Sequence, residues 1–139
     1  MEREWRDLLV KYPSLELDEF VIMPNHFHGL LGINPAGSEQ VTPTLGNVMG
    51  YFKYATTAKV NAVRGAAGTK LWQRDYFDHV VRTNDALDGI REYIRTNPAR
   101  WQEDTENPFG TGKDDVRTWV RQWDVPAVRG KGGVTPPLR

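Results

Sequence analysis

A proline in the most strand-like stretch of the chain constrains the fold more than any other single residue. Residues 15–22 (LELDEFVI) predict a strand, residues 23–25 (MPN) interrupt it, and residues 26–33 (HFHGLLGI) resume it. Proline has no N–H to donate to a strand ladder, so a strand containing Pro24 is predicted to lie at a sheet edge or to carry a bulge.

Three further stretches, at residues 2–11, 44 to about 63 and 85–96, have apolar residues at the three- and four-residue spacing of amphipathic helices. Beyond Trp101 this pattern weakens, and Trp119 and Trp123 are expected to dock a last helix over about 114–123. Thr44 and Asn84 stand where N-caps are expected. Residues 71–74 predict a short strand, whereas residues 76–81 fit either an extended segment or the start of a helix.

Length and composition favour one globular domain without membrane spans. The chain has 139 residues, of which 39% are hydrophobic and 26% charged. No stretch approaches the roughly 18–20 apolar residues that cross a bilayer, and the first residues do not resemble a secretory signal. The absence of cysteine excludes disulfides and thiolate metal sites. We therefore expect a cytoplasmic protein.

The charges are distributed unevenly, although the formal net charge is zero. Residues 1–50 carry three basic and seven acidic side chains, and residues 51–100 carry nine basic and five acidic ones. A local basic face is sufficient to hold phosphate groups, because the attraction is screened within about 10 Å. The alternative is that these lysines and arginines coat a solvated helix.

His26 and His28 flank Phe27 in the resumed strand. On a strand this spacing places both imidazoles on one face and Phe27 on the other. Two neutral imidazoles make up half of a divalent metal site, and Mg²⁺ or Mn²⁺ is favoured over zinc if the task is phosphoryl transfer. The alternative is that each ring is a surface residue or a hydrogen-bonded core residue.

Tyr76 is a candidate covalent nucleophile on phosphorus. His79, three residues later, shares a face with Tyr76 if this segment is helical and could complete a metal shell. The alternative for Tyr76 is a packed aromatic residue, and Tyr51 and Tyr54 on the preceding helix are rival candidates for the nucleophile. The candidate phosphate-binding cations around it are Lys53, Lys59, Arg74 and Arg82.

Three blocks in a fixed order resemble one family. Residues 21–30 (VIMPNHFHGL) resemble the VMPNHxHxL signature of the REP-associated tyrosine transposases. These are relatives of the single-tyrosine insertion-sequence transposases and belong to the HUH endonucleases. Residues 71–82 (LWQRDYFDHVVR) are similar to the family's WQxxYxDHxxR segment, and residues 92–101 (EYIRTNPARW) to its YIxxNPxxW segment.

The resemblance implies an α+β fold, a ferredoxin-like antiparallel sheet with helices packed on one face. It also implies that His26 and His28 bind Mg²⁺ or Mn²⁺ and that Tyr76, on a helix after the sheet, attacks a phosphate of single-stranded, hairpin-bearing DNA. The products would be a 5′-phosphotyrosine link and a free 3′-hydroxyl. That hydroxyl can later attack the link and rejoin the strands.

The beginning of the chain departs from the family pattern. Family members carry a further stretch with a central strand before the first helix, whereas Met1 opens directly into the helix here. We therefore expect the sheet to lack its first strand, in a truncated product, a fragment or a chain that pairs with a second copy as a homodimer. The predicted parts are a transposase-like domain (1–101), a C-terminal helical extension (102–128) and a flexible tail (129–139).

Three functions are open at this point. The leading hypothesis is a metal-dependent DNA strand transferase. The second is a DNA-binding remnant of such a transposase with impaired catalysis. The third is a structural metal-binding module without a role on nucleic acid.

Overall fold

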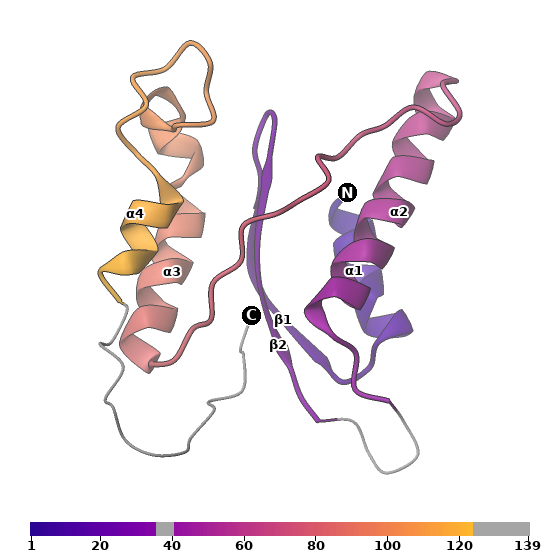
Figure 1. Ribbon diagram of the computed structural model, residues 1–139, viewed down its shortest axis with the longest axis horizontal. Coiled ribbons are helices and arrows are strands. Elements are labelled where there is room, and N and C mark those ends of the chain that lie inside the picture. The colour runs from indigo at the N-terminus through magenta and orange to yellow at the C-terminus, as the bar shows by residue number, and fades with distance from the viewer. Residues whose placement is uncertain (36–40, 124–139) are drawn as a thin grey trace. The chain divides into compact units, whose positions relative to one another are not determined.

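The computed structural model describes residues 1–35 and 41–123, which form helices and one two-stranded antiparallel sheet (Figure 1). In chain order the elements are α1 (Glu2–Lys11), β1 (Leu15–Ile22), β2 (Phe27–Ile33), α2 (Leu45–Arg64), α3 (Asn84–Thr96), the 3₁₀ helix η1 (Pro98–Glu103) and α4 (Val116–Arg121). This confirms the predicted α+β class with a short sheet. The ferredoxin-like topology stays a prediction.

Residue contacts divide the chain into two units. Unit 1 contains Met1–Leu17 and Leu31–Asp78, and unit 2 contains Asp18–Leu30 and the chain from His79 onward. Both units are therefore assembled from separate stretches of the sequence. The predicted parts 1–101 and 102–128 follow a different division, and residues 124–139, which include the predicted tail, lie outside the described residues.

Unit 1 is built on the packing of α1 against α2 (Figure 1). Trp5 and Leu8 of α1 are buried, as are Val48 and Phe52 of α2. The Trp5 and Phe52 rings meet edge to face, with their centroids 5.7 Å apart. Burying apolar side chains of this size contributes about 1.5–3 kcal/mol each, so the contact between α1 and α2 stabilises unit 1.

Both ends of α2 are defined by local capping interactions. The Thr44 hydroxyl accepts a hydrogen bond of 3.1 Å from the Asn47 backbone N–H, and the Asn47 side chain accepts one from the Thr44 N–H. At the other end Gly65 takes a left-handed conformation with φ of 63°. The predicted cap at Thr44 and the helix end near residue 63 are confirmed.

Residues 15–33 form a hairpin, so the prediction of one strand interrupted by Pro24 is wrong. The Met23 N–H donates a hydrogen bond of 2.9 Å to the His26 carbonyl, which leaves Pro24 and Asn25 as the connection between β1 and β2. Proline is tolerated there because a turn position requires no ladder N–H. The proline therefore lies in the turn that reverses the chain and does not interrupt a continuous strand.

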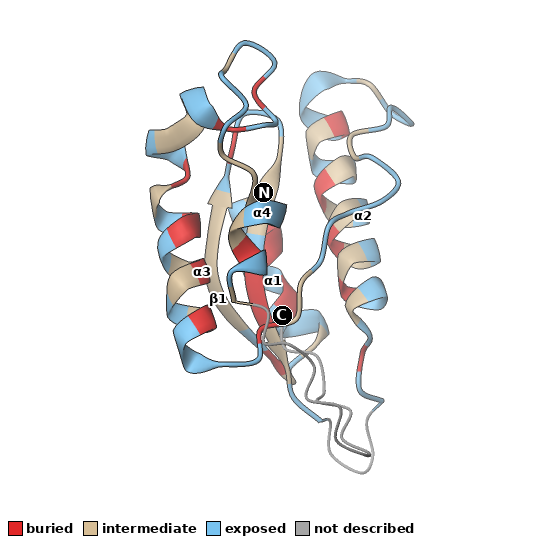
Figure 2. Ribbon diagram, turned by 60° about the vertical axis from the view of Figure 1, so that its left-hand side comes forward, coloured by how far each residue is buried: buried red, intermediate tan, exposed pale blue. Residues whose placement is uncertain are grey.

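Unit 2 has its apolar core between the closed end of the hairpin, α3 and α4. The buried core residues are Leu30, Val81, Ala86, Ile90, Ile94 and Val120. Buried positions recur along one face of α3 (Figure 2). Trp119 and Trp123 pack against this core, which confirms the predicted docking of the last helix, although α4 is shorter than expected. Gly89 allows the Trp123 indole to approach α3 closely, because a Cβ added at this glycine would lie 2.5 Å from Cζ2 of Trp123.

The cap of α3 is Thr83, not Asn84 as predicted. The Thr83 hydroxyl accepts a hydrogen bond of 3.1 Å from the Ala86 N–H, and Asn84 is the first residue of the helix. Both residue types are suited to this role, and the apolar pattern of the helix does not distinguish adjacent cap positions.

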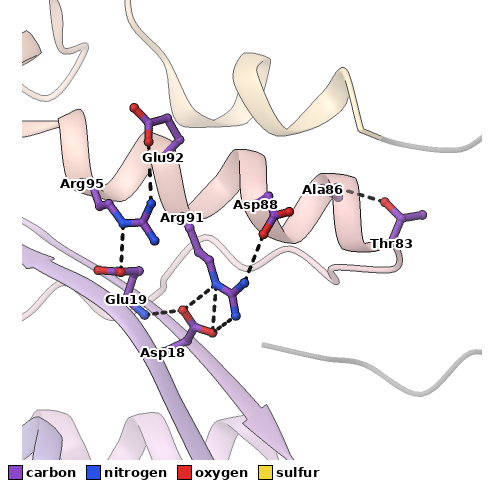
Figure 3. Close-up of polar contacts among 8 residues, drawn as sticks. All are labelled: Asp18, Glu19, Thr83, Ala86, Asp88, Arg91, Glu92 and Arg95. Carbon is purple, nitrogen blue, oxygen red and sulfur yellow. Dashed lines mark hydrogen bonds and ion pairs between the residues drawn. The ribbon is translucent and has the colours of Figure 1, made fainter.

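Two ion pairs join β1 to α3 within unit 2 (Figure 3). The Arg91 guanidinium donates three hydrogen bonds to the Asp18 carboxylate, the shortest being 2.6 Å, and a further one to Asp88. Arg95 donates one of 3.0 Å to Glu19. The hydrogen bonds from Arg91 lower the pKa of Asp18 below its ordinary range.

The segment after α2 contains neither the predicted strand at 71–74 nor a helix at Tyr76. Its backbone is held by side chains of α2 instead of by a strand ladder. The Lys53 ammonium donates hydrogen bonds of 2.9 and 3.3 Å to the Gln73 and Arg74 carbonyls. The Trp72 indole N–H donates one of 2.7 Å to the Thr56 hydroxyl.

No helix within residues 1–35 and 41–123 has the length and apolar character needed to cross a bilayer.

Candidate functional site

The two histidines of the HxH motif lie together at the closed end of the hairpin in unit 2. His28 belongs to β2, and His26 is the last residue before it. Their ring centroids are 4.7 Å apart, and the rings are inclined at 74°. The predicted pairing of the two imidazoles on one side of the backbone is therefore confirmed.

His28 is uncharged at neutral pH. Burial lowers its pKa to about 4, and the neighbouring His26 lowers it further by charge repulsion, while Asp104 opposes both effects. Its ring meets that of Tyr93 on α3 nearly edge to face, at a centroid distance of 5.8 Å. A neutral imidazole keeps one nitrogen lone pair, which is the form that binds a metal ion.

His26 is oriented through its Nδ1 atom. This nitrogen lies 2.9 Å from the side-chain oxygen of Asn25. The Asn25 amide nitrogen in turn donates a hydrogen bond of 2.7 Å to the Glu106 carbonyl, which defines the direction of the amide. The other ring nitrogen of His26, Nε2, is buried and has no hydrogen-bond partner.

A buried carboxylate faces His26. Oδ2 of Asp104 lies 3.5 Å from Nε2 of His26, and the Asp104 side chain is 3% exposed. The amide of Asn97 donates a hydrogen bond of 3.1 Å to the same Oδ2, and the backbone N–H of Glu106 donates one of 2.8 Å to Oδ1. The carboxylate is therefore fixed in orientation by these two hydrogen bonds.

Sequence reasoning missed these polar partners of His26. Asn25 lies inside the first motif block and Asn97 inside the third, so the blocks themselves carried a signal for both. Asp104 follows the third block by three residues, and no local pattern distinguishes it from any exposed aspartate. Its role depends on a contact between residues 78 positions apart, which only the fold shows.

Aromatic rings line the site on its other sides. The Trp101 ring lies 6.0 Å from that of His26, and Tyr93 contacts both His28 and Trp119. Burial raises the pKa of the Tyr93 hydroxyl above its ordinary range, and Asp114 and Asp104 add to this effect. Tyr93 therefore ionises less readily than an ordinary tyrosine.

The side chains around His26 and His28 meet some of the requirements of a site for a divalent cation. Two imidazoles and a carboxylate lie near one another, and one buried ring nitrogen lacks a partner. Within the described residues, however, no three His, Cys, Asp or Glu side chains form a group that could hold a metal ion. His79 is half-buried in unit 2 and does not form such a group with the other two histidines. Its role as a ligand stays a prediction.

Tyr76 lies in unit 1, on the irregular segment that α2 holds. Its side chain is exposed, and the Lys53 ammonium lies 5.2 Å from the centre of its ring. Of the two conformations predicted for residues 76–81, the helical one is not found, so Tyr76 and His79 do not share a helix face. The exposed phenol can nevertheless be approached by a large substrate.

The predicted DNA-binding cations differ in their surroundings. Lys53 is half-buried and directs its ammonium to backbone carbonyls, so it acts first as a structural tether. Lys59, Arg74 and Arg82 are exposed. Contact of these three side chains with DNA stays a prediction.

Comparison with known proteins decides the family. A family model described as "Transposase IS200 like" matches residues 7–97, which include the hairpin, the histidine pair, Tyr76 and α3. The chain belongs to the IS200-like transposase family. That match ends at Asn97, so Asp104 lies beyond the part of this transposase-family chain that the family model covers.

One curated relative of this IS200-like chain is an uncharacterized protein of Haemophilus influenzae. The two are 29% identical over an alignment that covers 72% of this chain and 63% of the relative. The chain thus spans less than two thirds of the length of that relative. No solved structure matches the chain significantly.

Proposed function

We propose that the chain cleaves and rejoins single-stranded DNA through a 5′-phosphotyrosine intermediate, with Mg²⁺ or Mn²⁺ as cofactor. The observation that carries this proposal is the pair of adjacent imidazoles at His26 and His28, one of them held neutral, in a member of a transposase family. A histidine pair kept ready to bind a cation is typical of metal-assisted phosphoryl transfer.

The histidine group supplies the binding site for the cofactor. A divalent cation bound there would polarise a phosphate oxygen and neutralise the charge that develops on it. His28 contributes a lone pair at neutral pH because burial keeps its ring uncharged. Asn25 holds the His26 ring through Nδ1 and leaves Nε2 for binding.

Tyr76 is the proposed nucleophile. Its phenolic oxygen forms a bond to phosphorus as the bond from phosphorus to the 3′-oxygen breaks, and the phenolic proton passes to solvent while the leaving oxygen gains one. The link to the 5′ strand conserves the phosphodiester energy. Attack by a 3′-hydroxyl on this link reverses the step and rejoins the strands.

We assign DNA binding to exposed cations, which contact phosphates, and to exposed aromatic rings, on which unstacked bases could lie. Lys59, Arg74 and Arg82 can neutralise backbone phosphates. The exposed Tyr54 ring and the half-exposed Phe77 ring offer faces on which bases could stack. Single-stranded DNA beside a hairpin presents both backbone phosphates and unstacked bases. A homodimer stays part of this proposal.

The experiment is a search for a covalent protein–DNA adduct. The full chain is incubated with hairpin-bearing single-stranded DNA and Mn²⁺, and the adduct is resolved by denaturing electrophoresis and mapped by mass spectrometry. We expect an adduct on Tyr76 that Tyr76→Phe abolishes. Tyr54→Phe is the matched control, because it alters another exposed tyrosine of unit 1 and should leave the adduct unchanged.

The remaining outcomes separate the other two functions. DNA binding that depends on salt but yields no adduct would favour the catalytically impaired remnant. Absence of DNA binding even at low salt, together with Mn²⁺ binding, would favour the structural metal-binding module.

A further inference from the structure

The two ring nitrogens of His26 have different roles that the surrounding hydrogen bonds define. The Asn25 amide nitrogen donates to the Glu106 carbonyl at 2.7 Å, so the Asn25 oxygen must be the atom facing Nδ1. An amide oxygen only accepts hydrogen bonds. Nδ1 of His26 therefore carries a proton, and in the neutral ring Nε2 carries the lone pair.

This lone pair points at a negative charge. Nε2 of His26 is buried without a hydrogen-bond partner, and Oδ2 of Asp104 faces it at 3.5 Å. The separation is too long for a good N–H···O hydrogen bond, which spans about 2.7–3.2 Å. A lone pair and a carboxylate oxygen in a buried setting repel each other unless a positive charge lies between them.

Asp104 has no other cation to balance it. In the part of the chain that the structure describes, Asp104 forms no ion pair with a lysine or arginine, whereas the neighbouring Asp114 pairs with Arg100 at 2.9 Å. Its two hydrogen bonds come from the neutral groups of Asn97 and Glu106. An almost fully buried carboxylate with only neutral donors retains a demand for positive charge.

We propose that Nε2 of His26 and Oδ2 of Asp104 are two ligand atoms of the same divalent cation, so that Asp104 is a metal ligand beyond the HxH motif. This inference rests on the proposed function for the presence of a cation. Two ligand atoms that are each about 2.1 Å from one cation lie roughly 3–4 Å apart, and the observed 3.5 Å falls in that range.

The surrounding groups act as positioning residues for these two ligands. Asn25 fixes the His26 ring by accepting from Nδ1, and Asn97 holds Oδ2 of Asp104 while the Glu106 N–H holds Oδ1. A mixed nitrogen and oxygen set with open positions for water and phosphate oxygens suits Mn²⁺ and Mg²⁺. The competing assignment is a proton on Nε2, which would make His26 and Asp104 a structural ion pair.

The first test measures Mn²⁺ binding to the full chain without DNA, by calorimetry and by the electron paramagnetic resonance signal of free Mn²⁺. We expect His26→Gln and Asp104→Asn each to weaken binding at least ten-fold. Asp18→Asn is the matched control, because Asp18 is a partly buried aspartate of the same unit that pairs with Arg91. Circular dichroism of every variant checks the fold. Affinity retained within two-fold in a folded Asp104→Asn, or no Mn²⁺ binding by the wild-type chain, would overturn the proposal.

A second test uses the wild-type chain and so does not depend on how Asp104→Asn folds. Long-range ¹H–¹⁵N NMR spectra report the protonation of both His26 nitrogens during addition of Mg²⁺, with His26→Gln used for assignment. We expect a proton on Nδ1 and a shift of the Nε2 resonance as Mg²⁺ binds. A His26 ring that stays doubly protonated at saturating Mg²⁺ would show the ion pair and overturn the proposal.

The two proposals fail in distinguishable ways. Mn²⁺ binding that depends on Asp104 in a chain that forms no DNA adduct would contradict the proposed function and support the ligand assignment. A Tyr76 adduct formed by a chain whose Mn²⁺ affinity does not depend on Asp104 would do the reverse.

Discussion

The ammonium of Lys53 lies 5.2 Å from the centre of the Tyr76 ring and donates hydrogen bonds to the two carbonyls at Gln73 and Arg74. A single lysine of α2 therefore holds the backbone that leads to the candidate nucleophile and also contacts its ring. In an irregular segment such side-chain tethers replace the hydrogen bonds that a helix or strand would supply.

Replacing Lys53 with methionine should loosen this segment. Each lost hydrogen bond contributes about 0.5–1.5 kcal/mol, so amide hydrogen exchange of residues 73–76 should rise about ten-fold. Hydrogen exchange with mass spectrometry measures this rate. Lys59→Met, on the same helix, should leave the exchange of these residues unchanged and weaken DNA binding instead. Unaltered exchange in Lys53→Met would show that the tether is not needed.

Replacing Thr56 with valine should destabilise unit 1. Thr56 is buried, and its hydroxyl accepts the indole N–H of Trp72 at 2.7 Å. The change leaves the Trp72 N–H unpaired and should lower the free energy of unfolding by about 1–2 kcal/mol, measured by urea unfolding. Thr57→Val is the control, because the Thr57 hydroxyl bonds only to its own helix at the Lys53 carbonyl. Equal losses in the two variants would contradict this account.

Two glycine-to-alanine substitutions should have opposite effects on stability. A Cβ at Gly50 of α2 meets no atom within 4 Å, so Gly50→Ala should raise the free energy of unfolding by about 0.5–1 kcal/mol through helix propensity. At Gly89 the same methyl group would collide with the Trp123 indole, and the loss should be about 1–3 kcal/mol. Thermal unfolding of both variants tests the contrast. Stabilisation by Gly89→Ala would mean that Trp123 packs elsewhere.

The Asp18–Arg91 pair should give the fold a dependence on acid pH. Hydrogen bonds from Arg91 lower the pKa of Asp18, so its stabilising contribution is complete above about pH 4, the ordinary range of an aspartate, and is lost as the pH falls through the lowered value. Asp18→Asn should therefore melt below the wild-type temperature at pH 7, and the difference should vanish at the acid end of the profile. A difference that does not depend on pH would assign the effect of Asp18 to packing.

Neutralising Arg74 and Arg82 together should weaken binding of single-stranded DNA and flatten its dependence on salt. The slope of log K against log salt should decrease by about 0.7 for each phosphate contact that is lost. Arg3→Gln, which removes one exposed arginine of α1, serves as the net-charge control for each single substitution at Arg74 or Arg82. An unchanged slope in the double variant would exclude phosphate contacts at both arginines.

The elements with strong local signals could be predicted from the sequence. The capping box at Thr44, the left-handed Gly65 and the apolar spacing of α1 each act within a few residues, and the corresponding helices are found where expected. The hairpin was missed because Pro24 fits both a strand interruption and a turn. Only the pairing of Met23 with His26 distinguishes the two.

The candidate site could be predicted only as far as its motif extends. His26 and His28 were found because they are neighbours in the sequence. Asp104 was not found, because its contact with His26 joins distant parts of the chain and a lone aspartate has no periodicity to mark it. The segment at Tyr76 was assigned a helix by resemblance, whereas Lys53 and Thr56 hold it in an irregular path.

Because unit 2 is assembled from two separate stretches of the chain, its parts are synthesised at different times. Leu30 leaves the ribosome roughly 50 residues before Val81 and still earlier than α4, although all of them share one core. At about 5–20 residues per second the hairpin waits several seconds for its apolar cover. During that interval the nascent β2 is an open template for pairing with another chain, until α3 and α4 cover the apolar residues of the hairpin.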